Sequence, residues 1–286
     1  MNDKEIVAWV AEAGSADERA FREAVHTILF AIASSASLQP QMIMKGGILM
    51  AIRYETGRFT RDIDFSTPLH YRAFEAGEGA FLEMLDRAIQ EAAAKMPYQL
   101  DCRQQSFRLQ PKRDGGNFQT LHIGIGYAYF GTNEHKRLIR KQAIKTVQVD
   151  YSFNEEIHDM DLLCIDDGNV AVQVYGELTQ IAEKLRAILQ QPERNRARGQ
   201  DVYDLHHVLS NYPIEDSARK AVLLEVLKDK ARSRGIEARS DSMADPRIKE
   251  RSVAAYEELL ATVEGELPDF EEAFMFVRKF YEELPW

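Results

Sequence analysis

The chain has 286 residues, of which 45% are hydrophobic and 29% are charged, and its formal net charge is −10 at pH 7. These proportions are typical of a globular protein and exclude an intrinsically disordered chain. The longest stretch without a charged residue, Ala24–Met44, contains several serines and a proline, which excludes a membrane-spanning helix there. The N-terminus has no apolar signal-peptide segment and the two cysteines have no CxxC spacing, so we expect a cytoplasmic protein with no membrane partner.

The charge is unevenly distributed along the chain. Residues 1–150 contain 19 basic and 18 acidic side chains, whereas residues 151–286 contain 17 and 28. Within the first half, residues 101–150 contain nine basic and four acidic side chains. An acidic protein is in general a poor ligand for nucleic acid, but a local basic region can still bind a polyanion.

The first residues of the chain predict a helix, a short strand and a second helix. Ser15 is expected to cap a helix that runs from Ala16 to about Ser37, and a buried strand follows at Met42–Met44. A Gly46-Gly47 turn then leads into a helix at Ile48–Tyr54.

A strand-rich region follows. Alternating polar and apolar residues predict strands, and a longer helical pattern ends before Pro97. In chain order we expect a strand at Phe59–Phe65, a helix at Tyr71–Met96, strands at Tyr98–Leu109, Leu121–Phe130 and Thr146–Phe153, and a hairpin of Leu162–Ile165 with Val170–Val174. The predicted turns of this region are Gly115-Gly116-Asn117 and Asp166-Asp167-Gly168-Asn169.

The pattern becomes helical after Tyr175. Helical periodicities separated by prolines and a glycine continue to about Leu284. We therefore predict an α+β fold: a mixed sheet with flanking helices in residues 1–175, followed by an all-helical domain in residues 176–286. The predicted breaks between the helices are Pro192, Pro213, Gly235, Pro246 and Pro268.

Two aspartates in the strand before Phe65 are the first candidate site. Asp62 and Asp64 are two positions apart, so in a strand both carboxylates project from one face while Ile63 projects from the other. Two adjacent carboxylates repel each other unless a cation lies between them. Carboxylate oxygens are preferred ligands of Mg²⁺, and the alternative is a solvated edge strand.

The Gly46-Gly47 pair lies where the buried strand turns into a helix. Glycine at this point allows backbone N–H groups to approach an anion, and the helix dipole favours negative charge there. The alternative is a tight turn that needs a positive φ.

A later strand, Val147–Tyr151, carries Asp150 on the face opposite to its valines. Three carboxylates of this kind suit two-metal phosphoryl transfer, although Asp150 alone would be a surface acid.

These motifs resemble a known family. The chain is similar to the DNA-polymerase-β-like nucleotidyltransferase superfamily in two motifs: Lys-Gly-Gly-x-x-Leu, which begins at Lys45, and Arg-x-Thr-x-Asp-Ile-Asp-Phe, which begins at Arg58. Within it, the chain most resembles the AbiEii/AbiGii nucleotidyltransferase toxin family of toxin–antitoxin and abortive-infection systems. The resemblance implies that Mg²⁺ or Mn²⁺ is bound by Asp62, Asp64 and Asp150, and that Lys45, Gly46, Gly47, Arg58 and Thr60 contact the NTP.

A second constellation lies in the helical half. Gly176–Gln190 has one apolar stripe, and Lys184 lies on its flank, where the ammonium can reach a cleft edge. The resemblance implies that Lys184 holds the triphosphate, whereas a solvated lysine is the alternative. Asp201 and Asp204 share one helix face. Asp201 is expected to contact the nucleotide or the acceptor, and Asp204 to orient Lys184 or a loop arginine.

Two basic clusters are candidates for acceptor binding. One precedes the Asp150 strand, where a helix would bring its residues to one face, and the other is a loop of alternating arginines. Either could instead be a solvated surface. The residues are Lys136, Arg137, Arg140 and Lys141 in the first cluster and Arg194, Arg196 and Arg198 in the second.

We therefore predict a metal-dependent nucleotidyltransferase toxin that transfers an NMP from an NTP to an acceptor hydroxyl, with Asp62, Asp64, Asp150 and Lys184 as its catalytic residues. The resemblance implies a tRNA 3′ end as acceptor and a cognate antitoxin as a further partner. The alternatives are a protein or small-molecule acceptor, or a degenerate nucleotidyltransferase fold that serves as a binding module.

Overall fold

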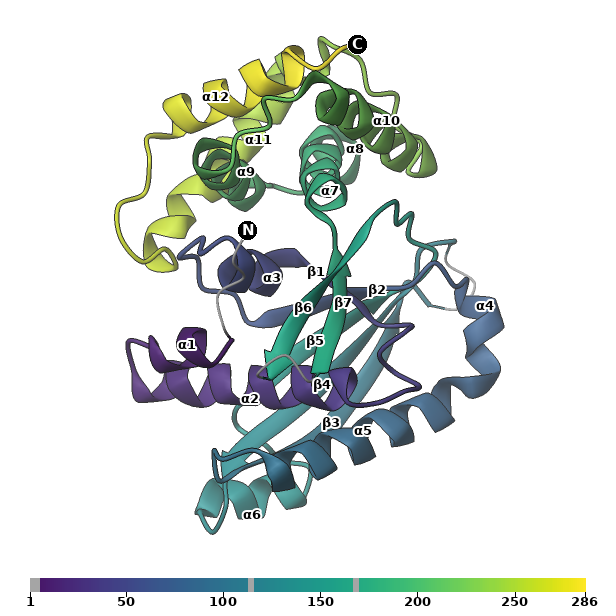
Figure 1. The fold of residues 1–286 in the computed structure, drawn as a ribbon, viewed down its shortest axis with the longest axis vertical. Helices are drawn as coiled ribbons and strands as arrows, with labels where there is room; N and C mark the ends of the chain where they lie inside the picture. Colours follow the sequence, from purple (N-terminus) through teal and green to yellow (C-terminus); the bar gives the residue numbers. More distant parts are fainter. Residues whose placement is uncertain (1–5, 113–115, 167–169) are drawn as a thin grey trace. The chain divides into compact units, whose positions relative to one another are not determined.

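The computed structural model describes residues 6–112, 116–166 and 170–286 (Figure 1). The chain forms two compact units. The first consists of residues 1–53 and 61–175, and the second of residues 54–60 and 176–286. Residues 54–60, which the sequence assigns to the first half, therefore pack with the helical unit.

A mixed sheet is the centre of the first unit. Among the described residues it has seven strands in the order β3-β4-β5-β2-β1-β7-β6. The strands β2 and β5, and β1 and β7, are parallel, and the other neighbours are antiparallel. Their bounds are β1 Ile43–Lys45, β2 Asp62–Ser66, β3 Leu100–Gln110, β4 Thr120–Tyr129, β5 Thr146–Ser152, β6 Met160–Asp166 and β7 Val170–Tyr175.

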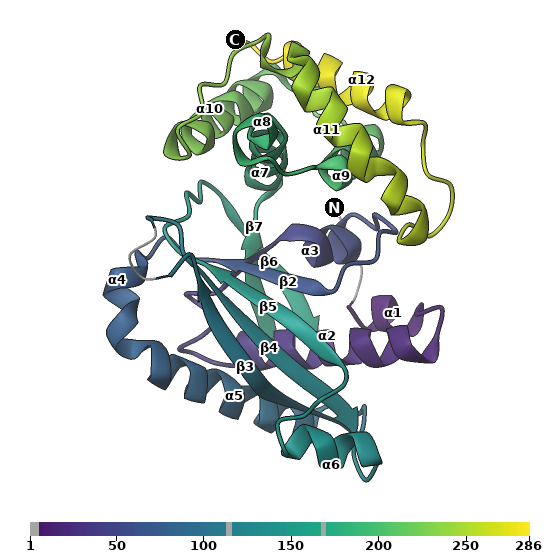
Figure 2. The same cartoon turned by 180° about the vertical axis from the view of Figure 1, so that it is seen from behind.

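Helices α2 (Ala16–Ala33) and α5 (Glu78–Lys95) cover one face of this sheet (Figures 1 and 2). Aromatic rings join the helices to β5: Phe81 of α5 stacks on Tyr151 at 5.3 Å between centroids, and Phe74, which precedes α5, lies 4.7 Å from Phe153, the residue after the strand. The alternation of β5 therefore turns Asp150 to the opposite face of the strands. The remaining helices of this unit are α1 Ile6–Ala11, α3 Gly46–Arg53, α4 Tyr71–Phe74 and α6 Asn133–Ile139.

Several predicted bounds in the first unit are wrong. The helix capped by Ser15, whose hydroxyl accepts from the Glu18 N–H, ends at Ala33 and not near Ser37. The predicted long helix is broken by a 3₁₀ turn, η1 (Glu75–Gly77), because glycine at its end favours departure from the α-helix. The strand predicted from Phe59 begins only at Asp62, since Phe59 donates its backbone N–H to Thr262 of the second unit.

The second unit is built mainly from helices. Proline occupies the first turn of two of them, where its missing N–H has no intrahelical partner to lose. Pro192 and Pro246 thus lie where new helices begin, so the predicted breaks coincide with helix boundaries. The elements are α7 Glu177–Leu189, α8 Gln191–Arg194, α9 Gly199–Asn211, α10 Ser217–Ser233, η2 Ser242–Ala244, α11 Pro246–Tyr256, η3 Glu257–Ala261 and α12 Phe270–Glu282.

The mixed sheet with flanking helices and the helical second unit confirm the predicted α+β class. The predicted turns at Gly115-Gly116-Asn117 and Asp166–Asn169 involve residues outside those that the structure describes. No helix within the described ranges has the length and apolar content needed to cross a bilayer.

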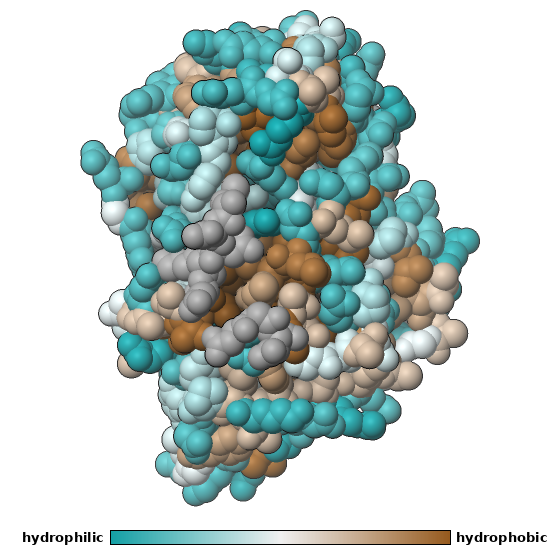
Figure 3. Space-filling model, in the orientation of Figure 1, coloured by the Kyte–Doolittle hydropathy of each residue, from teal (hydrophilic) through white to brown (hydrophobic). Residues whose placement is uncertain are grey.

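The strand β6 forms one edge of the sheet. Its side chains Met160 and Leu162 are 52% and 58% exposed. Figure 3 shows hydrophobic patches between hydrophilic residues on the face of the molecule that carries β6 and β7.

Candidate functional site

The three predicted acidic residues lie on two neighbouring strands. β2 and β5 are parallel, and their register places Asp64 directly beside Asp150 and Asp62 beside Gln148. Directly paired residues share a face of the sheet. Ile63 and Phe65 are buried on the other face. The structure therefore brings Asp62, Asp64 and Asp150 to one face, opposite to α2 and α5.

The electrostatics of this acidic group show crowding of negative charge. Asp62 is exposed as a residue, yet burial of its carboxylate by the surrounding protein raises its pKa. The neighbouring charge of Asp150 raises that pKa further, whereas His122 lowers it. A bound cation would relieve the repulsion between these carboxylates, because it stabilises their ionised forms.

The Gly46-Gly47 turn is close to the same carboxylates. Gly46 has a φ of +79°, and a Cβ at this position would overlap the side chain of Asp64. Glycine is thus required both by the backbone conformation and by the approach of Asp64 to the beginning of α3. Lys45, which pairs with Asp64 in the β1–β2 register, is buried, and its Nζ lies 3.4 Å from Glu155 Oε1.

His122 is the residue of this face that the sequence analysis missed. It lies on β4 opposite Asp150, and its Nδ1 donates to Asp150 Oδ1 at 2.7 Å. The alternation of β4 places His122 on the face opposite to the buried Leu121 and Ile123. That alternation is visible in the sequence, but the β4–β5 register that brings the two side chains together is not.

The second group of candidate residues is a buried ion network in the helical unit. Lys184 of α7 is 5% exposed, and its Nζ donates to Asp201 Oδ1 at 2.9 Å and to Asp204 Oδ2 at 2.7 Å, both on α9. Arg58 makes a bidentate contact with Asp204, with both N···O distances 3.1 Å. Lys184 is therefore buried and paired with carboxylates, and Asp204 contacts both the lysine and an arginine.

Coulombic attraction outweighs desolvation in this network. Burial alone would lower the pKa of Lys184, but the charges of Asp204 and Asp201 raise it above its ordinary value. Burial alone would likewise raise the pKa of Asp204, but Arg58 and Lys184 lower it to about 2. Both groups therefore remain charged at neutral pH although they are buried.

The segment that carries Arg58 is held by backbone contacts within the second unit. Tyr203 donates its hydroxyl to Thr56 O at 2.7 Å, and His207 Nε2 contacts Tyr54 O at 2.9 Å. Arg58 also forms an isolated β-bridge with Val263. Thr60, the last residue of this segment, is half-buried.

The first basic cluster is less helical than predicted. Only Lys136 and Arg137 belong to α6, because Arg140 caps this helix and Lys141 has a φ of +56°. All four side chains are nevertheless exposed. Exposed Ile139 lies among them, so the surface is basic and partly apolar.

The arginine cluster of the second unit is larger than the sequence indicates. Arg194 ends the short helix α8, and only Arg196 and Arg198 lie in the following loop. Burial lowers the pKa of Arg194, and the charges of Arg234, which follows α10, and of Arg186 in α7 lower it further, as do the two loop arginines. Arg198 is also paired with Asp201 at 3.5 Å.

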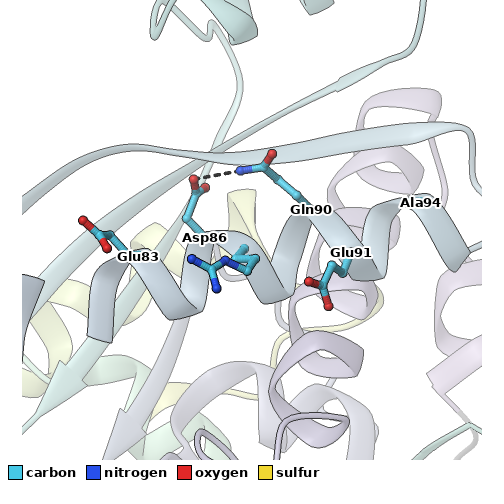
Figure 4. Close-up of a pocket in the computed structure, with 6 residues that line it drawn as sticks. Glu83, Asp86, Gln90, Glu91 and Ala94 are labelled. Atoms are coloured by element: carbon cyan, nitrogen blue, oxygen red, sulfur yellow. Dashed lines mark hydrogen bonds between the residues drawn. The ribbon is translucent and has the colours of Figure 1, made fainter. Parts of the chain in front are cut away.

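A pocket of about 580 Å³ lies along α5, away from the acidic group (Figure 4). Most of its lining residues are polar or charged, and Asp86 accepts a hydrogen bond from Gln90 at 2.8 Å. It contains none of the predicted site residues. The lining residues are Glu83, Asp86, Arg87, Gln90, Glu91 and Ala94.

Comparison with known proteins identifies the family. The family model described as "Nucleotidyl transferase AbiEii toxin, Type IV TA system" matches residues 27–276, which include both groups of candidate residues. The chain belongs to the AbiEii nucleotidyltransferase toxin family. This confirms the resemblance seen in the sequence, and it makes the protein a nucleotidyltransferase toxin of a type IV toxin–antitoxin system.

Solved structures show the same fold at low sequence identity. JHP933 from Helicobacter pylori matches with a TM-score of 0.55 and 16% identity, over 92% of this chain and 90% of that one. MenT4, a nucleotidyltransferase toxin from Mycobacterium tuberculosis H37Rv, matches with a TM-score of 0.51 and 18% identity, over 97% and 89%. The comparison with curated proteins found no match.

Gly46→Ala tests the close approach of Asp64 in this AbiEii protein. Gly131 is a matched control, because its φ of +78° is nearly that of Gly46 but a Cβ there would meet nothing within 4 Å. Each alanine should cost about 1 kcal/mol for the left-handed backbone. Gly46→Ala should cost more, because the new methyl group displaces Asp64. Urea unfolding of both variants measures the difference. Equal losses in the free energy of unfolding would show that Asp64 does not restrict the residue at position 46.

The stability of the AbiEii protein should fall steeply in acid. Because the pKa of Asp204 is lower in the folded chain than its ordinary value of 3.8, the unfolded chain takes up the proton first. The stabilisation is therefore complete above about pH 4 and is lost as the pH falls toward about 2; the shift corresponds to about 2 kcal/mol.

Urea unfolding between pH 5 and pH 2.5 measures this loss. Arg58→Gln removes one of the charges that lower the pKa of Asp204, so in this variant the loss of stability should be smaller and should end at a higher pH. Lys249→Gln removes an exposed ion pair with Glu271 and serves as the control. An identical acid profile for wild type and Arg58→Gln would contradict the assignment.

Proposed function

We propose that this AbiEii protein transfers an NMP from an NTP to an acceptor hydroxyl with the help of a divalent cation. The observation that carries the proposal is the side-by-side placement of Asp64 and Asp150 on parallel strands, with Asp62 on the same face. An aspartate set of this kind, in a family of nucleotidyltransferases, is suited to phosphoryl transfer.

The acidic group is suited to bind Mg²⁺ or Mn²⁺ when the substrate supplies the remaining oxygen ligands. Within the described residues, no three His, Cys, Asp or Glu side chains converge as a ready-made metal site. Mg²⁺ is usually bound by one or two carboxylates together with phosphate oxygens and water, so a complete protein cage is not needed. The raised pKa of Asp62 supports the fit, because burial and then the charge of Asp150 disfavour the ionised carboxylate, which a cation would stabilise.

In the proposed reaction, Asp62, Asp64 and Asp150 would hold a divalent cation, and that cation would supply charge stabilisation for the phosphate oxygens. The acceptor hydroxyl attacks the α-phosphorus while Asp150 takes its proton. The bond from the α-phosphorus to the bridging oxygen breaks, and pyrophosphate leaves with the electron pair. Fixed positions on two strands favour this chemistry, because they spare the reorganisation of the carboxylates.

The remaining contacts to the NTP are part of the same proposal. In the first unit, Lys45, Gly46 and Gly47 are next to Asp64 in the β1–β2 register or at the beginning of α3. In the second unit, Lys184 uses two of its three N–H donors on Asp201 and Asp204. We assign its third donor to a phosphate oxygen. The nucleotide-contacting residues proposed from the second unit are Arg58, Thr60, Lys184, Asp201 and Asp204.

A tRNA 3′ end is the proposed acceptor, and cytoplasm is the proposed location of the reaction. The exposed basic residues near α6 support a polyanionic acceptor, as do the clustered arginines of the second unit. A cognate antitoxin, as the family implies, would prevent the growth arrest, with phage defence as one setting. Radiolabelled NTP incubated with total tRNA, with lysate protein or with buffer alone tests the acceptor, and label on protein alone would contradict it.

Asp62→Asn and Asp64→Asn should lower the rate of transfer by at least about 10²-fold, because each removes a negative ligand and leaves the side-chain shape. The Asp86→Asn variant is the control, since Asp86 lines the α5 pocket on the other side of the sheet. Transfer of labelled NMP measures the effect, and thermal unfolding checks that the variants fold. Full activity in both site variants would refute a metal site at this position.

The basic residues near α6 can be tested separately from the chemistry. Changing Lys136, Arg137, Arg140 and Lys141 to Glu should weaken tRNA binding at least tenfold and flatten the log–log salt dependence by about 3, since each phosphate contact contributes less than one unit. The affinity for NTP should not change. A matched variant reverses four charges on α10 and α12, two of them exposed and two half-buried: Arg232 and Lys279, and Lys228 and Arg278.

Salt-dependent tRNA binding of both quadruple variants decides between the surfaces. Equal losses of tRNA affinity in the two variants would show that binding depends only on the net charge of the protein. Unchanged binding in the α6 variant would instead favour the loop with Arg196 and Arg198.

A further inference from the structure

Ionisable side chains form a row across the sheet of the first unit. The strand registers pair Lys45 with Asp64, Asp64 with Asp150, Asp150 with His122, and His122 with Arg108. Directly opposite residues of neighbouring strands lie on the same face. The two carboxylates in the middle of the row therefore have nitrogen-bearing side chains on both sides.

The contact between His122 and Asp150 is a direct hydrogen bond within this row. Nδ1 of the imidazole lies 2.7 Å from Oδ1 of the carboxylate, and the two side chains are 19% and 22% exposed. A carboxylate accepts only, so the imidazole nitrogen is the donor. Both residues belong to regular strands, so backbone hydrogen bonds hold the donor and the acceptor in place.

We propose that His122 is a positioning residue for the transfer reaction: its Nδ1–H holds Oδ1 of Asp150, so that Asp150 acts on the cation and on the acceptor hydroxyl through Oδ2 alone. The inference rests on the proposed function of Asp150. A carboxylate with one oxygen engaged has a fixed side-chain rotamer and binds a cation through a single oxygen. Without the histidine, the same side chain can rotate and can bind in several ways.

The alternative is that the contact only joins β4 to β5. The chain offers a matched control for this, because Thr120 and Ser152 form another side-chain hydrogen bond between the same strands, at 3.2 Å, two residues away on the same face. Thr120→Val removes that bond without touching Asp150. A loss specific to His122 therefore cannot be ascribed to strand pairing.

Two substitutions of His122 separate shape from hydrogen bonding. His122→Phe keeps a ring and removes the donor, whereas His122→Asn places an amide N–H near the position of Nδ1. We expect His122→Phe to lower kcat by about tenfold or more with little change in the KM for NTP, and His122→Asn to recover most of the loss. Thr120→Val should keep both constants near those of wild type.

Binding of Mn²⁺, measured by calorimetry on the full chain without NTP, is the readout that does not depend on activity. His122→Phe should weaken it by about tenfold, and His122→Asn should restore it. Thermal unfolding of each variant confirms that it is folded. If His122→Phe fails to fold, His122→Asn and His122→Gln replace the pair, because only the asparagine places its amide near Nδ1.

The outcomes separate this inference from the proposed function. If the wild type transfers NMP and His122→Phe has no specific effect on kcat or on Mn²⁺ affinity, the inference about His122 is overturned and the proposed function stands. Loss of Mn²⁺ affinity in His122→Phe, with recovery in His122→Asn, would support it even if no acceptor is labelled. A wild-type chain that transfers nothing and binds no Mn²⁺ would overturn both.

Discussion

Like charges held side by side are the constraint on which the first unit depends. The parallel register of β2 and β5 places Asp64 beside Asp150, and such a pair is unfavourable unless positive charge or hydrogen-bond donors surround it. His122 meets this need on one side by a hydrogen bond. On the other side, Gly46 leaves room for the Asp64 carboxylate at the beginning of α3, where the helix dipole favours negative charge.

The second unit also holds ionised side chains close together, but there they are buried. Lys184 and Asp204 are removed from water, which is unfavourable for each charge alone, and the network is stable because every charge has partners. Arg58 completes it from a segment that is distant in sequence. The result is a fixed lysine with two carboxylates, a more rigid arrangement than a solvent-exposed lysine on a helix flank would provide.

The two groups of residues differ in how far sequence patterns could predict them. Asp62 and Asp64 share a face because strand alternation has a period of two, which needs no tertiary information. The burial of Lys184 could not be predicted in the same way, because a lysine on the flank of an apolar stripe can equally well be solvated. Only the packing of α9 against α7 places Asp201 and Asp204 over its ammonium.

The sequence by itself determined the α+β class, the order of most elements and the motifs that identify the AbiEii family, because these depend on local periodicity and on short spacings. It did not determine which strands become neighbours. The pairing of Asp64 with Asp150, the donation of His122 to Asp150 and the transfer of residues 54–60 to the helical unit all join segments far apart in the chain. Register and long-range packing decide such contacts, and the free energy that selects them belongs to the whole fold and not to any one segment.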